Sequence, residues 1–81
     1  MKVELDRKAD AAYVELSQAQ VDRQLELDGS RILDLAADGS IVGVEFLSPS
    51  RGVDLNGIPR AAEIGRALRR RGLRVISVVE G

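Results

Sequence analysis

The chain has 81 residues, 44% hydrophobic and 31% charged, with a net charge of −1. A chain of this length forms one domain and buries roughly 60 to 65% of the surface that its unfolded form exposes. Cysteine and histidine are both absent, which excludes disulfides, thiolate or imidazole metal ligands, and Ser-His-Asp or Cys-His catalysis. Because the sequence has neither a membrane-spanning apolar run nor the apolar core of a signal peptide in its first ten residues, we expect a cytoplasmic protein.

The charges are distributed unevenly along the chain. Residues 1–48 carry ten acidic and five basic side chains, whereas residues 49–81 carry three acidic and seven basic ones. Opposite signs favour packing of the two parts on one another or pairing between subunits. A basic segment can also bind a polyanion.

The first half alternates between apolar and polar residues, which predicts β-strands. Residues 2–6 form a first strand with Val3 and Leu5 inward. Residues 12–16 form a second strand with Val14 inward and Tyr13 outward, so the polar segment between them predicts a hairpin. Residues 17–20 are expected to be a loop, and residues 21–27 form a third strand.

Two Asp-Gly pairs predict further hairpins. A two-residue turn centred on Asp38 and Gly39 sets Leu35 opposite Val42, Leu33 opposite Val44 and Arg31 opposite Phe46. These pairs give one apolar face, whereas the other face is mixed and carries Ile32, Asp34, Ala36, Ile41, Gly43, Glu45 and Leu47.

The turn at Asp28 and Gly29 allows two registers. A two-residue turn on this pair sets Leu25 opposite Ile32, and a three-residue loop with Gly29 in a left-handed conformation sets Leu25 opposite Leu33. The second register keeps Leu25 on the apolar face, so we prefer it.

The last third predicts one helix and one strand. Residues 49–58 are a linker, and Pro59 fits the first turn of a helix over residues 59–71. Apolar or small residues recur at helical spacing on one face of that helix: Ala61, Ile64, Gly65 and Leu68. Residues 73–79 form a closing strand that adds to a sheet edge or to a partner.

These elements predict an α+β fold over residues 1–81. Residues 1–48 form an antiparallel β-meander of four to five short strands, on which the helix packs, and a final strand follows. The mixed sheet face, the short core and the apolar closing strand together favour a homodimer.

Two motifs resemble the small bacterial "domain of unknown function 2283" family. Members of this family have a pattern similar to D-x-x-x-D-A-x-Y-x-x-L near the start. The matching residues in this sequence are Asp6, Asp10, Ala11, Tyr13 and Leu16. A D-x-D-G-x-x-V-G-x-E-x-L hairpin follows, comprising Asp38, Gly39, Val42, Gly43, Glu45 and Leu47, with Ala36 where an acidic residue is frequent. The resemblance covers roughly the first 50 residues, and the helical tail is an extension that many members lack. It implies no established activity, but some members are encoded beside small toxin-like proteins, which implies an antitoxin or partner-binding role.

The mixed face offers one candidate cluster. Asp34 and Glu45 share this face and in principle suit acid–base work or a Mg²⁺ or Ca²⁺ site. The more economical interpretation is that they are solvated or accept hydrogen bonds from helix arginines. Gly43 lies within a strand, which indicates room for the helix or a bulky neighbour. No base partner for a catalytic Tyr13 is evident, so Tyr13 is interpreted as a sheet-surface or interface residue.

An arginine cluster is the other candidate. Arg66, Arg69, Arg70, Arg71 and Arg74 lie in or after the predicted helix. Helical residues point about 100° apart, so three consecutive arginines cannot line one groove, and no aromatic residues are interleaved to stack bases. Helix-dipole stabilisation, pairing with the acidic meander or an acidic protein partner is therefore favoured over nucleic-acid binding.

We expect a non-enzymatic interaction protein, antitoxin-like in the sense that it binds a small toxin-like partner, without catalytic, cofactor or metal sites. Its candidate partner-binding residues are Arg66, Arg69, Arg70, Arg71, Asp34 and Glu45. The alternative is a small ligand- or nucleic-acid-binding module that uses the arginine-rich helix. It predicts a concave pocket with convergent polar groups.

Overall fold

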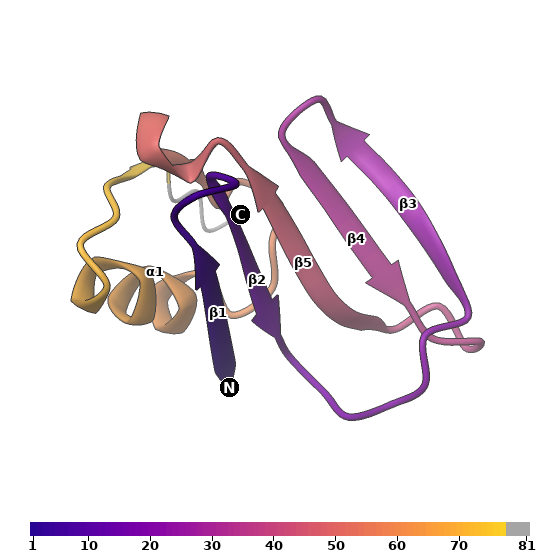
Figure 1. The fold of residues 1–81 in the computed structure, drawn as a ribbon. Helices are drawn as coiled ribbons and strands as arrows, with labels where there is room; N and C mark the ends of the chain where they lie inside the picture. The colour runs from indigo at the N-terminus through magenta and orange to yellow at the C-terminus, as the bar shows by residue number, and fades with distance from the viewer. Residues whose placement is uncertain (78–81) are drawn as a thin grey trace. The chain divides into compact units, whose positions relative to one another are not determined.

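The first unit of the chain is a five-stranded antiparallel sheet in the computed structural model, which describes residues 1–77 (Figure 1). The strands are β1 (Lys2–Asp6), β2 (Ala11–Glu15), β3 (Arg23–Asp28), β4 (Arg31–Leu35) and β5 (Ile41–Leu47). Their spatial order is β1-β2-β5-β4-β3, so β1 and β3 are the edges. The chain divides into two compact units, Met1–Leu47 and Ser48–Gly81, and has the predicted α+β class.

One face of the sheet carries the predicted apolar side chains. Directly paired residues share a face, and the pairings form two rows across all five strands: Val3-Val14-Val44-Leu33-Leu25 and Leu5-Ala12-Phe46-Arg31-Asp28. Burial is complete in the middle of the first row, where Val14 and Val44 are 0% exposed, but Leu25 at its β3 end is 50% exposed. The core-facing rows are therefore covered at the centre and open at β3.

The Asp38-Gly39 turn differs from the prediction. The loop has three residues, because Ala36 and Ser40 close it through a hydrogen bond from Ala36 N to Ser40 O at 2.9 Å. Gly39 has a φ of 86°, the left-handed conformation that completes this type of loop. The longer loop sets Leu35 opposite Ile41 instead of Val42.

A β-bulge then restores the predicted register. Between the Leu35–Ile41 and Asp34–Gly43 pairs, Val42 is one extra residue on β5. Its carbonyl oxygen accepts hydrogen bonds from Leu16 N at 2.8 Å and Ser17 N at 3.1 Å. The predicted Leu33–Val44 and Arg31–Phe46 pairs are confirmed.

At the first Asp-Gly turn, the loop is shorter than predicted, whereas at the second it is longer. The predicted Leu25–Leu33 pair is confirmed, but Gly29 is not left-handed, and the loop between Asp28 and Arg31 has only two residues. Leu27 is the extra residue of a bulge that keeps Leu25 opposite Leu33.

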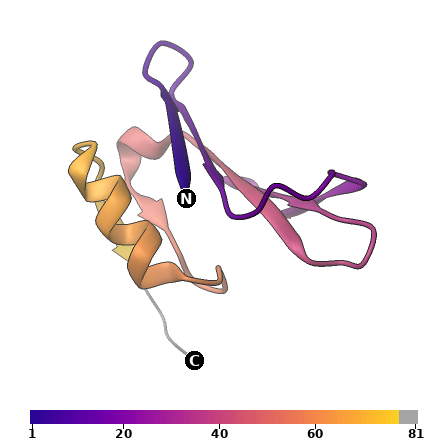
Figure 2. The ribbon, with the colours of Figure 1, turned by 90° about the horizontal axis from the view of Figure 1, so that it is seen from below.

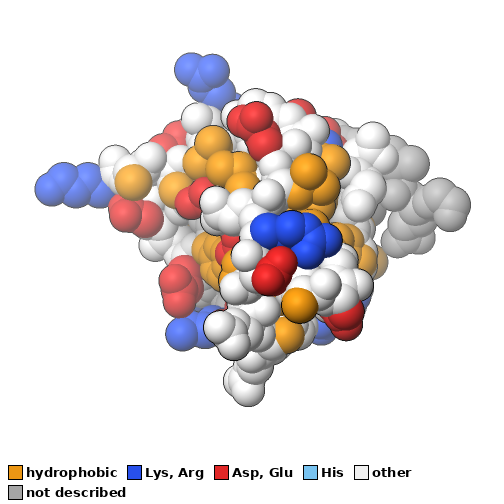
Figure 3. All heavy atoms as spheres, turned by 90° about the vertical axis from the view of Figure 1, so that its right-hand side faces the viewer, with side chains coloured by type: hydrophobic (Ala, Val, Ile, Leu, Met, Phe, Trp, Pro, Cys, Tyr) orange, Lys and Arg blue, Asp and Glu red, His pale blue; other side chains and the backbone are white. Residues whose placement is uncertain are grey.

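The third strand is shorter and more exposed than predicted. It begins at Arg23, after a loop that continues from residue 17 through residue 22. All six of its residues are exposed, and Figure 3, which shows the β3 side, has hydrophobic side chains at the surface among charged ones. Leu25 and Leu27 are thus accessible to solvent.

The second unit contains one helix and a pair of parallel strands (Figure 2). A 3₁₀ turn (η1, Pro49–Arg51) precedes β6 (Val53–Asp54), α1 (Ala61–Arg70) and β7 (Val75–Ser77). The described part of the closing strand, Val75–Ser77, pairs in parallel with β6, which lies in the segment predicted as a linker, and this part does not extend an edge of the larger sheet. The predicted strand residues 78 and 79 lie outside the described residues.

Helix α1 follows the predicted apolar pattern, with Ala61, Ile64, Gly65 and Leu68 buried. It begins two residues later than predicted, because Arg60 adopts a left-handed conformation (φ 58°) as its N-cap and leaves Pro59 in the preceding turn. Arg60 Nη2 pairs with Glu63 Oε2 at 2.8 Å across the first turn. Within residues 1–77, no helix has the length and apolar character needed to cross a membrane.

Candidate interaction surface on the sheet

The second face of the sheet is strongly acidic. Two rows run across it from β1 to β3: Glu4-Tyr13-Glu45-Ile32-Glu26 and Lys2-Glu15-Gly43-Asp34-Gln24. We call these ten residues the acidic face. It combines five carboxylates with one ammonium group, and it arises because each strand alternates apolar and polar residues while the bulges keep the alternation aligned between strands.

The centre of the acidic face is a hydrogen-bonded group. The Tyr13 hydroxyl donates to Asp34 Oδ2 at 2.8 Å, and Gln24 Nε2 donates to Asp34 Oδ1 at 2.9 Å. Because Tyr13 is on β2 and Asp34 is on β4, the phenol ring must reach across β5. Gly43 allows this, since a Cβ at that position would collide with the Tyr13 hydroxyl and ring. The predicted bulky neighbour of Gly43 is therefore Tyr13.

The environment holds the phenol in its protonated form. Burial, the hydrogen bond to Asp34, and the nearby charges of Asp34, Glu15 and Glu4 raise the pKa of Tyr13 to about 12. A phenol with this pKa donates a hydrogen bond at neutral pH and is a poor base or nucleophile. The hydrogen bond from Tyr13 to Asp34 therefore holds both side chains in place on the acidic face.

Three carboxylates around this centre are available to a partner. Within residues 1–77, the side chains of Glu15, Glu26 and Glu45 have no ion-pair or hydrogen-bond partner. Glu4, at the β1 end, pairs with Lys2 at 3.3 Å in an exposed contact. Those three unpaired carboxylates give the acidic face a negative charge that nothing in the described sheet neutralises.

An open hollow adjoins the acidic face at the β1–β2 hairpin. It has a volume of about 760 Å³ and is lined by Glu4, Leu5, Asp6, Arg7, Lys8, Ala9, Ala11, Ala12, Tyr13 and Glu45. Ligand pockets are usually lined mainly by apolar side chains, whereas half of the residues that line this one are charged, three acidic and two basic. Among residues 1–77, no three acidic side chains are grouped so as to hold a metal ion.

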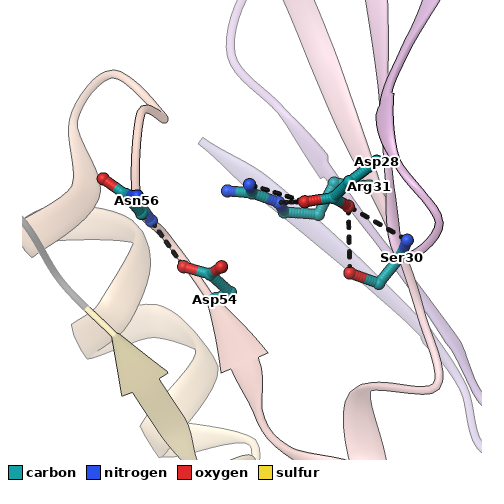
Figure 4. Close-up of polar contacts among 5 residues, drawn as sticks. All are labelled: Asp28, Ser30, Arg31, Asp54 and Asn56. Atoms are coloured by element: carbon teal, nitrogen blue, oxygen red, sulfur yellow. Dashed lines mark hydrogen bonds and ion pairs between the residues drawn. The ribbon is translucent and has the colours of Figure 1, made fainter.

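A buried arginine lies on the opposite, core-facing side. Arg31 is 7% exposed, and its Nε and Nη2 donate to Asp28 Oδ2 at 3.0 and 2.7 Å (Figure 4). The Arg31 hydrogen bond, followed by those from Ser30, lowers the pKa of Asp28 to about 2. The same figure shows Asp54 in the second unit, which accepts a hydrogen bond from Asn56 N at 2.9 Å.

The predicted binding residues fall in both units. Asp34 and Glu45 lie on the acidic face in adjacent rows, and the partners of Asp34 are Tyr13 and Gln24. The four predicted arginines are exposed in the second unit, three on α1 and Arg71 at its C-cap.

Sequence reasoning missed the Tyr13–Asp34 hydrogen bond. The signal was present in the pairing of β2 with β5, which sets Tyr13 opposite Glu45 and one row away from Gly43. A glycine diagonal to a tyrosine on neighbouring strands leaves space for the ring to cross. The order of the strands was required to use this signal.

Comparison with known proteins assigns the segment that contains the large sheet to a protein family. The family model described as "Protein of unknown function (DUF2283)" matches residues 2–50, and thus covers all five strands of the first unit. Searches among curated proteins and among solved structures give no significant match. Because the matched segment is more than half of the chain, the protein belongs to the DUF2283 family of proteins of unknown function.

Proposed function

We propose that this chain is a non-enzymatic interaction protein whose acidic face binds a basic protein. The observation that supports it is the set of unpaired carboxylates, Glu15, Glu26 and Glu45, around the Tyr13–Asp34 hydrogen bond. Opposite charge on a partner speeds association and selects against acidic competitors.

The composition of the acidic face suits protein recognition. Tyrosine is enriched at the centres of interfaces, where it offers a large apolar area with few rotatable bonds. Tyr13 and the half-buried Ile32 supply apolar contact between charged groups. The hydrogen bonds to Asp34 fix this centre before binding, which reduces the ordering cost of association.

The hollow beside the hairpin fits the same partner. Its carboxylates, Glu4, Asp6 and Glu45, would receive an arginine or lysine side chain of the bound protein. A small cationic ligand is the competing occupant, and it would bind without a protein partner.

A catalytic role has little chemical support in this surface. The raised pKa of Tyr13 keeps its proton in place, and the chain has no histidine or cysteine. We therefore propose binding alone, with the basic partner encoded by a neighbouring gene, as for an antitoxin and its toxin.

Co-expression tests this proposal. The full chain, tagged, is produced with the product of its neighbouring gene, alongside a Glu15→Gln, Glu26→Gln, Glu45→Gln variant and an Arg66→Gln, Arg69→Gln, Arg70→Gln variant. Three exposed ion pairs contribute about 0.6 to 3 kcal/mol, so we expect affinity to fall about tenfold in the first variant only. Failure of the wild-type chain to bind the neighbour's product would refute the proposal. Binding of the Glu15→Gln, Glu26→Gln, Glu45→Gln variant with the affinity of the wild-type chain would also refute it.

The second candidate function is nucleic-acid binding by α1. Arg66, Arg69 and Arg70 are exposed and spaced i, i+3, i+4, which places them on one side of the helix. A gel shift with random duplex and single-stranded nucleic acid at about 50 mM salt tests it. Absence of a shift at tens of micromolar protein removes this candidate.

A further inference from the structure

The two edges of the large sheet differ in how they are protected. An edge strand leaves alternate backbone N–H and C=O groups without strand partners, and natural proteins cover it or place charges and prolines on it. On β1, Val3 and Leu5 are half-buried and Lys2 is charged. On β3, every residue is exposed, including Leu25 at 50% and Leu27 at 41%.

The regular part of β3 is long enough to accept another strand. Residues 23–26 pair with β4 in unbroken register, and the bulge at Leu27 disturbs only the hairpin end. This stretch contains no proline, and its charged residues are Arg23 and Glu26. Its core-facing side presents Leu25 at the uncovered end of the Val3-Val14-Val44-Leu33-Leu25 row.

We infer that β3 pairs antiparallel with β3 of a second copy of this chain, with Leu25 opposite Leu25 of the second copy. In this register, the Gln24 amide lies opposite the Glu26 carboxylate of the other copy, and Arg23 lies opposite Leu27. The two chains then form one continuous ten-stranded sheet across a two-fold axis perpendicular to it.

Charge selects this register over its neighbours. A two-fold axis perpendicular to the sheet requires paired residue numbers that sum to an even value, because paired side chains share a face. Centring the axis on Gln24 sets Asp22 opposite Glu26, and centring it on Glu26 sets Glu26 opposite itself. Both arrangements oppose like charges, which is destabilising. The Leu25-centred register opposes Asp22 and Asp28, but these carboxylates are paired with Arg23 and Arg31. Asp28 also lies beyond the bulge at Leu27. The other two registers instead oppose the unpaired Glu26 carboxylate to a like charge.

The pairing has a consequence for the acidic face. The same two-fold axis places both acidic faces on one side of the ten-stranded sheet, and both exposed Leu25 side chains on the other. The β3 edge shares Gln24 and Glu26 with the acidic face proposed to bind a basic protein. Self-association and binding of a basic partner are measured separately, so either proposal can fail without the other.

Sedimentation or light scattering of the full chain tests the inference. From about 1 to 100 µM, the wild-type mass should rise to twice 8.8 kDa. Leu25→Lys, which opposes two lysines at the axis, should weaken self-association at least tenfold. Ile76→Lys, at another exposed apolar side chain (57%), should leave it unchanged. A monomeric wild type at about 100 µM, or a dimer sensitive only to Ile76→Lys, would overturn the inference.

Cysteine crosslinking gives a second measurement that does not depend on the lysine variant folding. The chain has no cysteine, so a single introduced thiol reports its own environment. Directly opposed residues have Cβ atoms about 4.5 to 5.5 Å apart, close to disulfide range. Leu25→Cys should therefore oxidise to a covalent dimer, and a mixture of Gln24→Cys and Glu26→Cys chains should crosslink more than either alone. An Ile76→Cys chain should stay monomeric; if it crosslinks as fast as Leu25→Cys, β3 is not the interface.

Discussion

The two units of this chain use their secondary structure differently. The first has strands of five to seven residues whose two faces have separate tasks, one apolar and one acidic. The second has a two-residue and a three-residue strand in parallel, and a helix whose exposed side is rich in arginine. The family match at residues 2–50 covers the first unit and only the first three residues of the second. The acidic face therefore belongs to the part that the family shares.

The largest expected effect is a difference in stability between substitutions on the two faces of β5. Phe46→Ala removes the largest fully buried side chain and should lower the free energy of unfolding by about 3 to 5 kcal/mol. Leu47→Ala, at a neighbouring side chain that is 37% exposed, should cost less than about 1 kcal/mol. Urea unfolding followed by circular dichroism measures both, and equal losses would contradict the distinction between a buried and a solvated face.

A smaller effect concerns the Asp28–Arg31 pair. Asp28→Asn should lower stability at neutral pH by about 1 to 2 kcal/mol, because Arg31 is buried but Asp28 is 41% exposed to solvent. The pKa of Asp28 is lowered to about 2, so its contribution is present above the ordinary pKa of 3.8 and is lost as pH falls through about 2.

Acid titration of stability checks this pair. Relative to wild type, Asp28→Asn should remove the part of the stability loss between about pH 4 and pH 2 that this carboxylate causes. Asp22→Asn is the matched control, since its ion pair with Arg23 is about half exposed on both sides. If stability depends on pH in the same way in both variants, Asp28 does not stabilise the buried Arg31 guanidinium.

The glycines of the two units should respond in opposite directions to alanine. Gly43→Ala should cost about 1 kcal/mol, because the new Cβ displaces the Tyr13 ring and breaks its bond to Asp34. Gly65→Ala should stabilise α1 by up to about 1 kcal/mol, since its Cβ would make an ordinary contact with Leu55 Cδ1 at 3.5 Å.

A double-mutant cycle isolates the cause at Gly43. With Tyr13→Ala present, Gly43→Ala should no longer be destabilising, because alanine is favoured over glycine within a strand. If Gly43→Ala still lowers stability in the Tyr13→Ala background, glycine is required at position 43 by the backbone and not by the space that the Tyr13 ring occupies.

The smallest expected effect is at alkaline pH. Because the pKa of Tyr13 is raised to about 12, its contribution to stability is complete below pH 10 and is lost as pH rises from 10 through 12. Wild type should therefore lose more stability than Tyr13→Phe between about pH 9 and pH 12. Parallel slopes for the two proteins would contradict the hydrogen-bonded, protonated phenol.

The sequence predicted the sheet better than its turns. Alternation placed Leu33, Val44 and Phe46 on one face correctly, because a one-residue slip would turn every side chain to the wrong face. The loop lengths at Asp28-Gly29 and Asp38-Gly39 were both wrong by one residue, in opposite directions. In each hairpin a bulge corrects the difference, at Leu27 and at Val42. Turn geometry depends on backbone angles that an Asp-Gly pair does not determine alone.

Other features required the fold itself. Strand β6 has only Val53 and Asp54, too few residues for alternation to be recognised, so the pairing of the closing strand could not be predicted. The contact of Tyr13 with Asp34 depends on β5 lying between β2 and β4, which local patterns do not specify. The predicted carboxylates, Asp34 and Glu45, do lie on one face because they follow from the same alternation.

The most direct test of the proposed acidic binding surface is an NMR titration of the isotopically labelled full chain with an octa-arginine peptide. At about 50 mM salt, amide shifts should concentrate on the two rows of the acidic face and weaken as salt is raised. The Glu15→Gln, Glu26→Gln, Glu45→Gln variant should lose most of these shifts. Shifts that are absent, that spread evenly over the surface, or that persist in this variant would contradict the account.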